Sequence, residues 1–488
     1  MKQRLYSLAR QTLVYGVSAA ALQIVGVITL PVFARTFTPS EYGVLEIATA
    51  ALAAMLVIAD LGMASASQRS YFDYSDEHVH ERRGVIATAL ATSLATASLL
   101  AAVLIVFREP IADWLLHSAD EADVVVLVAL CLPVAILALL LREVMRLRFM
   151  PWLYSLSSIA GAVVAAALGI GLVVAADTGV EGVLIGVLAG HAVSVLVGIP
   201  ATARHVGRRL SRPELRVMLA YGLPLLPAAA AMWGLAFVDR VLLSRLADLD
   251  DVGQYAVGAR FAAVLMLVVT AFGLAYTPYM LSMFAEDREV EKQVRGRTLT
   301  YVAIVLTAIS LVLALFAREI ATIVAPDFTQ AYEVVGILCL GVSAFGISTV
   351  AMAGISLVRK TGYYAAFSLT ALAFNVGLCF ALIPPLGAVG AALAAAAAYA
   401  LLTGLYYHRS QVLYPTPYEP RKVIAVLVLG AAVVPLGLLP LGPGFVALKV
   451  AGLVAFAVAL FAVRVVGRLE LMELKSLVGR LTPRASGA

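Results

Sequence analysis

The chain has 488 residues, of which 62% are hydrophobic and only 13% are charged, and its mean hydropathy is +0.97. These values lie far from those of soluble globular proteins, so the composition excludes a soluble enzyme or binding domain and indicates a polytopic membrane protein. The formal net charge of +5 could by itself suggest a nucleic acid or an anionic lipid as a partner. The positions of the basic residues decide between these interpretations.

Apolar stretches of about 20 residues recur along the whole chain and predict fourteen membrane-spanning helices. They lie at about 11–34, 43–67, 84–106, 122–141, 153–176, 182–203, 218–238, 253–280, 298–317, 332–357, 363–383, 387–407, 423–440 and 446–466. The first stretch follows three basic residues, as a secretory signal does. It is too long for a signal and continues into LPVFARTF instead of a small-residue cleavage site, so we interpret it as the first span.

The basic residues are strongly biased to one side of the predicted membrane. Because the number of spans is even, both termini are expected on the same side, and 28 of the 35 Lys and Arg residues fall there. The other seven are Arg35, Arg108, Arg240, Arg245, Arg260, Arg318 and Lys449. This bias predicts that both termini lie in the cytoplasm. The positive charge is then a consequence of topology, and no nucleic-acid partner is expected.

Six landmarks in the first half recur in the second half at an offset of 206 to 211 residues. Examples are Tyr15-Gly16 with Tyr221-Gly222, and Leu130-Cys131-Leu132 with Leu338-Cys339-Leu340. Six matches in register indicate a six-helix unit used twice, followed by two further helices. The predicted domains are a first bundle at 1–206, its repeat at 207–415, two additional helices at 416–466 and a cytoplasmic tail at 467–488.

The predicted fold class is therefore an all-α integral membrane protein built from two parallel six-helix repeats and two C-terminal helices. An even number of spans per unit leaves both repeats in the same orientation, enclosing a central cavity that can open to either side. Such geometry favours a transporter. The longest connections, near 68–83, 107–121, 204–217 and 281–297, are each under about 20 residues and leave no room for a soluble domain. Pro224 and Pro227, at the start of the second repeat, are the predicted hinge.

Charged residues at membrane depth are the candidates for function. A transported anion needs cationic groups along its path, and a guanidinium group suits phosphate, so Arg35, Arg240 and Arg260 are the predicted substrate-binding residues. The carboxylates of Asp60 and Asp239 are the candidates for a coupling proton or sodium ion. Further cavity candidates are Glu46, which we expect to face Arg260 across the axis between the repeats, and the polar residues Gln23 and Asn375.

Structural roles for the same residues remain open at this level. Arg35 and Arg240 could extend to the outer membrane interface, Asp239 could pair with a neighbouring Arg, and Asp60 could lie at the inner interface beside Arg69. Gln23 and Asn375 could be hydrogen-bond partners between helices. His191 is expected to be a packing residue, and the three cysteines, Cys131, Cys339 and Cys379, are expected to be buried hydrophobic groups.

Enzyme signatures are missing from the sequence. It contains no Gly-rich phosphate loop, HExxH, CxxC or GxSxG pattern, and its cysteines lack metal-ligand spacing. We therefore expect no catalytic activity, no resident metal and no cofactor other than the coupling H⁺ or Na⁺.

Three stretches carry a resemblance to a known family. They are LPVFARTFTPSEYGVLEIATA after the first span, YGLPLLPAAAAMWGLAFVDRVLLSRLADLDDVGQYAVGARFA at the middle, and NVGLCFALIPPLGAVGAALAAAAAY from Asn375. The sequence resembles the polysaccharide biosynthesis exporters, the O-antigen and exopolysaccharide flippases of the multidrug/oligosaccharidyl-lipid/polysaccharide (MOP) superfamily. The resemblance covers essentially the whole chain. Asp239-Arg240, Gly253-Gln254-Tyr255, and Asn375 with Ile383-Pro384 match the family pattern.

The resemblance implies a MOP-type transporter fold, a location in the bacterial cytoplasmic (inner) membrane, and alternating access driven by a cation gradient. The implied substrate is an undecaprenyl-pyrophosphate-linked oligosaccharide, a repeat unit of lipopolysaccharide O-antigen or exopolysaccharide. Membrane lipids, a polysaccharide polymerase and chain-length machinery are the implied partners. The family shares a cationic cavity but no fixed set of substrate contacts. The N-terminal sequence does not resemble the pattern of the peptidoglycan-precursor flippases.

Two other functions stay open. A multidrug or small-metabolite cation antiporter would use the same architecture, and the repeat cannot separate it from a flippase. A membrane enzyme such as a polysaccharide polymerase or ligase is disfavoured by the repeat and by the short outer connections.

Overall fold

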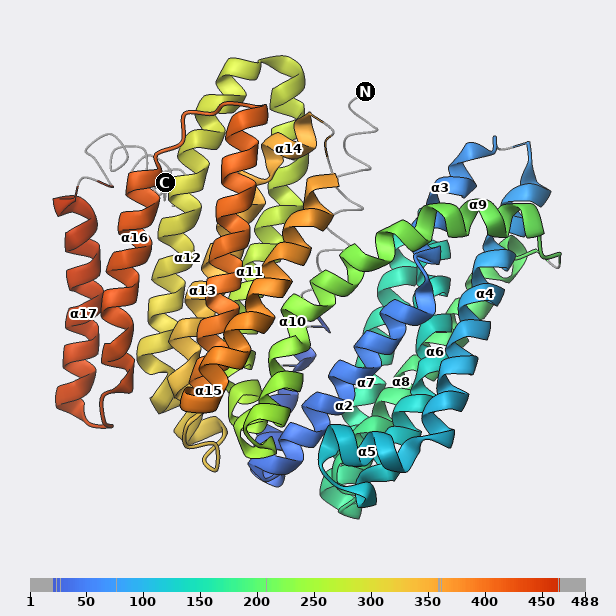
Figure 1. The fold of residues 1–488 in the computed structure, drawn as a ribbon, viewed down its shortest axis with the longest axis horizontal. Helices are drawn as coiled ribbons and strands as arrows, with labels where there is room; N and C mark the ends of the chain where they lie inside the picture. The colour runs from blue at the N-terminus through green and yellow to red at the C-terminus, as the bar shows by residue number, and fades with distance from the viewer. Residues whose placement is uncertain are drawn as a thin grey trace, which may run out of the picture.

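The computed structural model of the chain describes residues 21–22, 24–26, 28–75, 77–207, 209–358, 360, 362–463 and 465. Within these residues the regular secondary structure is helical. The helices form two bundles that lie side by side and approach each other at one end (Figure 1). The predicted all-α membrane fold is confirmed.

The first bundle begins with the helix Ile24–Thr36. Its further helices are α2 (Pro39–Asp60), α3 (Met63–Asp73), α4 (Val79–Val106), α5 (Arg108–Leu116), α6 (Ala122–Leu147), α7 (Pro151–Ala176) and α8 (Gly179–Thr202). Helices α7 and α8 pack along each other, and α6 packs against α8. Small residues allow this approach: Ser157 Oγ donates to the Ser194 carbonyl at 3.2 Å, and Ser194 Oγ donates to the Ser157 carbonyl at 2.9 Å.

The second bundle is entered through α9 (Arg212–Gly222). It continues with α10 (Leu226–Leu246), α11 (Leu249–Glu286), α12 (Arg288–Val324), α13 (Ala331–Ala351), α14 (Ala353–Leu357), α15 (Gly362–Leu413), α16 (Pro420–Val433) and α17 (Pro443–Ala462). The last two helices lie on the outside of this bundle, away from the first one (Figure 1). Lys449 of α17 is fully buried and forms an ion pair with Glu319 of α12 at 2.7 Å. This contact connects the two C-terminal helices, α16 and α17, to the rest of the second bundle.

The described helices account for the fourteen predicted spans. Twelve of them are long and apolar enough to cross a membrane. The 52-residue helix α15 counts once among these but contains two spans, because its backbone leaves the helical region at Gly387 (φ 52°, ψ −131°). The helix Ile24–Thr36 is the described part of the first span. The predicted tail at 467–488 lies outside the described residues.

Most of the long connections between the predicted spans are helical. The connection at 68–83 contains the end of α3, and the connection at 107–121 contains α5. In the connection at 281–297 the helical structure is interrupted only at Asp287, whose side chain caps α12 by accepting from the backbone N–H of Glu289 at 2.8 Å. Hydropathy locates the apolar spans but not their polar extensions, since charged residues can continue a helix beyond the hydrocarbon region.

The two bundles meet where α2 and α11 begin. Thr38 and Glu41 form a reciprocal capping box at the start of α2, and Asp248 caps α11 by accepting from Asp251 N at 2.8 Å. Two glycines then allow the backbones to touch. A Cβ atom on Gly43 would lie 2.2 Å from the Leu249 carbonyl oxygen, and one on Gly253 would lie 2.0 Å from that of Pro39. Equivalent helices of the two repeats therefore begin at the same end, as parallel repeats require.

At the opposite end, two helix breaks lie against each other. Helix α2 ends at Leu61 and Gly62, both with positive φ (51° and 73°), and a Cβ on Gly62 would lie 2.5 Å from the Gly222 carbonyl oxygen. A 3₁₀ turn at Leu223–Leu225, which contains the predicted hinge residue Pro224, separates α9 from α10. Pro227 occupies the first turn of α10. The predicted hinge thus coincides with a break in the helical path between the bundles (Figure 1).

A polar contact outside the spans reinforces this junction. The Tyr74 hydroxyl donates a hydrogen bond to the Glu214 carboxylate, which raises the pKa of Tyr74 to about 12. Because this phenol stays protonated at physiological pH, the end of α3 stays hydrogen-bonded to α9.

Candidate functional site

Six polar side chains from three helices form a cluster between the two bundles. Tyr42 and Glu46 come from α2, Asp239 and Arg240 from α10, and Tyr255 and Arg260 from α11. We call this set the Glu46 cluster. It lies near the end of the molecule where α2 and α11 touch, since Glu46 is seven residues from the start of α2, or roughly 10 Å along the helix.

Glu46 holds the two bundles together electrostatically. Its Oε1 is 2.6 Å from Arg260 Nη2, and its Oε2 is 3.3 Å from Arg240 Nε. The side chain of Glu46 is only 5% exposed, so this carboxylate is taken out of water and compensated by two guanidinium groups. The predicted contact between Glu46 and Arg260 is confirmed.

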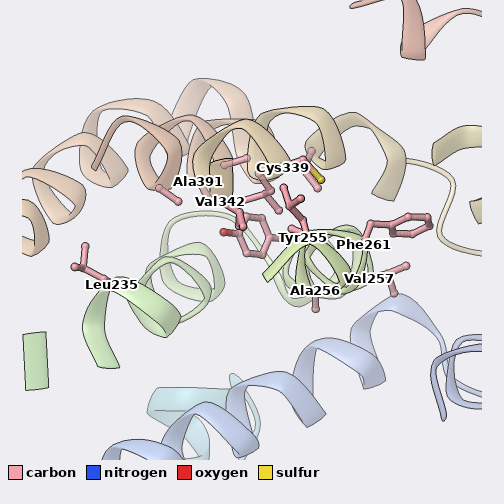
Figure 2. Packing of buried hydrophobic residues seen from close by; sticks show 14 of the residues in the cluster. Leu235, Tyr255, Ala256, Val257, Phe261, Cys339, Val342 and Ala391 are labelled. Carbon is pink, nitrogen blue, oxygen red and sulfur yellow. The ribbon is translucent and has the colours of Figure 1, made fainter. Parts of the chain in front are cut away.

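Asp239 is the second buried carboxylate of the cluster. It accepts hydrogen bonds from the Tyr255 hydroxyl, from the backbone N–H of Arg240 at 2.8 Å and from Arg240 Nη1 at 3.3 Å. The possibility that Asp239 pairs with a neighbouring Arg is therefore the arrangement in this structure. Figure 2 shows Tyr255 on α11, with its hydroxyl directed away from α2, whereas Ala256 and Val257 lie on the side of α11 that faces α2.

The two arginines of the cluster differ in their surroundings. Arg240 is mostly enclosed: its Nη1 also donates to the Ala236 carbonyl at 2.8 Å, and its guanidinium carbon lies 5.3 Å from the centre of the Tyr255 ring. Arg260 is 40% exposed and has Tyr42 as a second hydrogen-bond partner. The cluster contains two acidic and two basic groups. Arg260 is the one whose remaining donors are accessible to a ligand.

Arg35 does not belong to this cluster, which corrects the expectation that three arginines line one site. Its Nη2 donates to the carbonyl oxygen of Ile323, near the end of α12, at 2.6 Å, and this contact is exposed. The residue follows the first span by sequence, and sequence position alone could not show that it turns toward α12.

The remaining candidates lie apart from the cluster or outside the described residues. Asp60, half-buried at the end of α2, accepts from Ala64 N at 3.1 Å, and its carbonyl oxygen accepts from Ser93 Oγ at 3.3 Å. Asn375 of α15 is fully buried, and its Oδ1 accepts from Cys379 Sγ at 3.2 Å. Its Nδ2 has no hydrogen-bond partner among the described residues. Gln23 lies outside the described residues.

Sequence reasoning missed the two tyrosines and a polar pocket inside the first bundle. Tyr42 directly precedes the closely packed Gly43, and Tyr255 lies two residues after the closely packed Gly253, so the segments Tyr42-Gly43 and Gly253-Gln254-Tyr255 were the available signal. The pocket, of about 310 Å³, is lined by residues that include Arg142, Tyr154 and His191. Arg142 lies just beyond the predicted span 122–141 but belongs to α6, and His191 of α8 also lines this pocket.

An apolar pocket of about 350 Å³ lies beside the Glu46 cluster. Its walls are nonpolar side chains of the first bundle, including Ile47 and Trp114, together with Trp233 and Val241 of α10. Trp233 also joins the bundles, because its Nε1 donates to the Ala50 carbonyl at 3.2 Å. A polar cluster and an apolar pocket are therefore adjacent at the junction of the two halves.

Comparison with proteins of known sequence gives the family. The family model described as "Polysaccharide biosynthesis protein" matches residues 8–284, more than half of the chain. The succinoglycan biosynthesis transport protein ExoT of Rhizobium meliloti is 24% identical over 326 residues. That alignment covers 64% of this chain and 62% of the length of the relative.

Solved structures give the fold class. The inward closed conformation of the lipid II flippase MurJ superposes with a TM-score of 0.73 at 13% identity, covering 93% of this chain and all of that structure. The inward-facing conformation of a multidrug resistance MATE family transporter of the MOP superfamily gives a TM-score of 0.65 at 13% identity, covering 80% of this chain and 94% of that structure.

All of these relatives are transporters or flippases rather than enzymes. The fold and the family match agree with each other. The chain is a multi-pass membrane protein with the fold of the MurJ and MATE structures, and it belongs to the polysaccharide biosynthesis protein family.

Proposed function

We propose that the protein translocates an undecaprenyl-pyrophosphate-linked oligosaccharide across the cytoplasmic membrane, from the cytoplasmic to the outer leaflet, by alternating access. The observation that carries the proposal is the Glu46 cluster: paired arginines between two rocking bundles, one of them with accessible donors. The comparisons support a lipid-linked substrate, since relatives are described as a flippase and a succinoglycan transport protein.

In this mechanism Arg260 binds the pyrophosphate, because a guanidinium group offers several charged donors to phosphate oxygens. Arg240, which is more enclosed, keeps Glu46 paired when Arg260 turns to the substrate. Arg35 would then contact the substrate only at the end of the path. The apolar pocket beside the cluster suits a segment of the polyprenyl chain, since its lining is nonpolar.

The bias in the positions of the basic residues supports a cytoplasmic location for both termini. The end of the molecule where α2 and α11 touch would then face the outside, and the opposite end would face the cytoplasm. The structure would then be closed toward the outside. The neighbouring polymerase and chain-length machinery would take up the oligosaccharide after translocation.

Depletion of the protein in the native cell is expected to leave the lipid-linked oligosaccharide on the cytoplasmic leaflet. Expression of the wild-type protein should restore its appearance on the outer leaflet, measured by glycan labelling in intact and in permeabilised cells. Normal export in depleted cells, together with new sensitivity to small toxic compounds, would instead support the drug or metabolite antiporter.

We propose that the coupling ion, H⁺ or Na⁺, acts at Asp239. This carboxylate is buried in the cluster and neutralises Arg240, so a cation bound at Asp239 would release the arginine and change the charge balance of the Glu46 cluster. Asp60, the other candidate, lies at the far end of α2 and contacts backbone donors instead.

The variant Asp239→Asn keeps the side-chain shape but removes the titratable and cation-binding charge. We expect its transport rate to lose its dependence on the ion gradient and to fall about tenfold, a typical coupling between two sites. The rate should be measured in liposomes with and without imposed H⁺ or Na⁺ gradients, with Asp60→Asn as the matched control. Gradient dependence that survives in Asp239→Asn and disappears in Asp60→Asn would move the coupling site to Asp60.

A further inference from the structure

A separate pocket lies at the end of the first bundle that is remote from the Glu46 cluster, where α4 begins and α8 ends. Its volume is about 810 Å³, within the usual range of ligand pockets, about 300–1,000 Å³. It is lined by His80, Arg83, Gly84, Ala203, Arg204, Val206, Gly207 and Arg209. Three arginines and a histidine thus face one cavity, and among the described residues that line it none is acidic.

The arginines of this pocket lack the carboxylate partners that other basic residues of the protein have. Arg146 pairs with Glu143 at 2.5 Å, and Arg240 and Arg260 share Glu46. No carboxylate of a described residue forms an ion pair with Arg83, Arg204 or Arg209. The Nε atom of Arg83 is buried and has no hydrogen-bond partner within the described chain. A buried donor without a partner is unfavourable and points to a missing acceptor.

Backbone contacts fix the wall of this pocket. The N–H of Gly207 donates to the Arg83 carbonyl at 3.0 Å, and the N–H of Ser211 donates to Thr88 Oγ1 at 3.0 Å. The close approach requires a glycine, since a Cβ on Gly207 would lie 2.8 Å from the Arg83 carbonyl oxygen. The segment that carries Arg204 and Arg209 is therefore held against α4, so its arginines converge on Arg83 with little further ordering.

We propose that this pocket binds a phosphate group. Arginine forks match phosphate oxygens in geometry and charge, and Arg83, whose Nε has no hydrogen-bond partner among the described residues, lines the pocket. Arg83 is four residues after the start of α4, or roughly 6 Å along the helix, which is the level of a lipid headgroup at the end of a span. The phosphate comes either from an anionic lipid headgroup or from a soluble pyrophosphate-type anion.

This site goes beyond the transport function and does not depend on it. Arg83 belongs to the first bundle, whereas Arg204 and Arg209 belong to the connection that leads to α9 and then to the second bundle. A phosphate that bridges them joins this connection to α4. A bound phosphate would thereby restrain the connection between the two bundles. It would do so without contacting the transported substrate.

The test measures binding to the purified full-length protein by native mass spectrometry in detergent. The probes are cardiolipin and phosphatidylglycerol as anionic lipids, phosphatidylethanolamine as the zwitterionic lipid, and inorganic pyrophosphate as the soluble anion. The double variant Arg83→Gln/Arg204→Gln is compared with the wild type and with Arg421→Gln, which changes an exposed arginine of the other bundle. The melting temperature of each variant shows whether it is folded.

We expect the double variant to weaken binding of the effective probe at least about tenfold, because hydrogen bonds to charged groups are lost. Arg421→Gln should bind like the wild type. If the double variant loses binding of the anionic lipids alone, the pocket is a headgroup site. If it loses binding of pyrophosphate alone, the pocket is a site for a soluble phosphate. The proposal is overturned if no probe binds the wild type, or if the folded double variant binds every probe as well as the wild type. An equal loss in Arg421→Gln would also overturn it, because binding would then follow overall charge.

Discussion

Replacing Arg260 with Met is expected to abolish substrate translocation while leaving the protein folded. The methionine keeps the aliphatic volume in α11 but removes the accessible charged donors that we assign to the pyrophosphate. Loss of a charged contact that is made during transport should reduce the rate at least about a hundredfold. The rate is measured as movement of a lipid-linked oligosaccharide in liposomes, and Arg421→Met serves as the matched control on an exposed surface.

A comparison with Glu46 separates the transport role of Arg260 from its structural role. Glu46→Gln leaves Arg240 and Arg260 without their shared carboxylate and should destabilise the protein by about 3 kcal/mol, as expected for breaking a buried ion pair. In the double variant Glu46→Gln/Arg260→Met much of that stability should return, because fewer unpaired charges remain. Transport should not return. Full transport in folded Arg260→Met would refute the assignment of the anion site.

Replacing Gly253 with Leu is expected to prevent closure of the end where the bundles meet, and so to block the transport cycle. A Cβ atom at this position would lie 2.0 Å from the Pro39 carbonyl oxygen and 2.7 Å from its carbonyl carbon, and both are backbone atoms that cannot move aside locally. The two bundles must therefore separate at α2 and α11. We expect transport to fall at least about a hundredfold, since one of the two alternating states becomes inaccessible.

The opening can be measured by labelling a cysteine introduced at Ala256, which is 1% exposed and lies on the side of α11 that faces α2 (Figure 2). The three native cysteines, all buried, are replaced in this background. A maleimide that cannot cross the membrane, added outside intact cells, should label Ala256→Cys strongly only when Gly253→Leu is also present. Gly377→Leu is the matched control, because nothing lies within 4 Å of a Cβ at that position. Labelling only from the cytoplasmic side would reverse the proposed orientation.

The sequence was sufficient to predict the all-α membrane fold and the pairing of Glu46 with Arg260. The fold follows from the length of the apolar stretches, and the pairing follows from charges of opposite sign at equivalent positions of the predicted repeat. The helical connections could not be predicted from hydropathy, because α3 and α5 are short and partly polar. The contact of Arg35 with Ile323 joins residues far apart in the chain and carries no periodic signal.

The composition of the site was predicted less completely than the fold. Charge at membrane depth identified Asp239, Arg240 and Arg260, yet it could not show that Asp239 and Glu46 neutralise both arginines in this conformation. It also could not find Tyr42 or Tyr255, since tyrosine is common in membrane helices and only the folded chain brings these two to the cluster. The pocket at Arg83 was not predicted, because its arginines had been interpreted only as part of the cytoplasmic bias of basic residues.

The most direct test of the account is translocation by the purified protein in liposomes. A fluorescent oligosaccharide linked to undecaprenyl pyrophosphate is placed in both leaflets, and a membrane-impermeant quencher reports the fraction that changes leaflet. We predict translocation by the wild type that stops in Arg260→Met and continues in Arg421→Met. Failure of the folded wild-type protein to move the lipid, combined with exchange of a soluble cationic compound for H⁺ or Na⁺, would contradict the flippase and establish the antiporter.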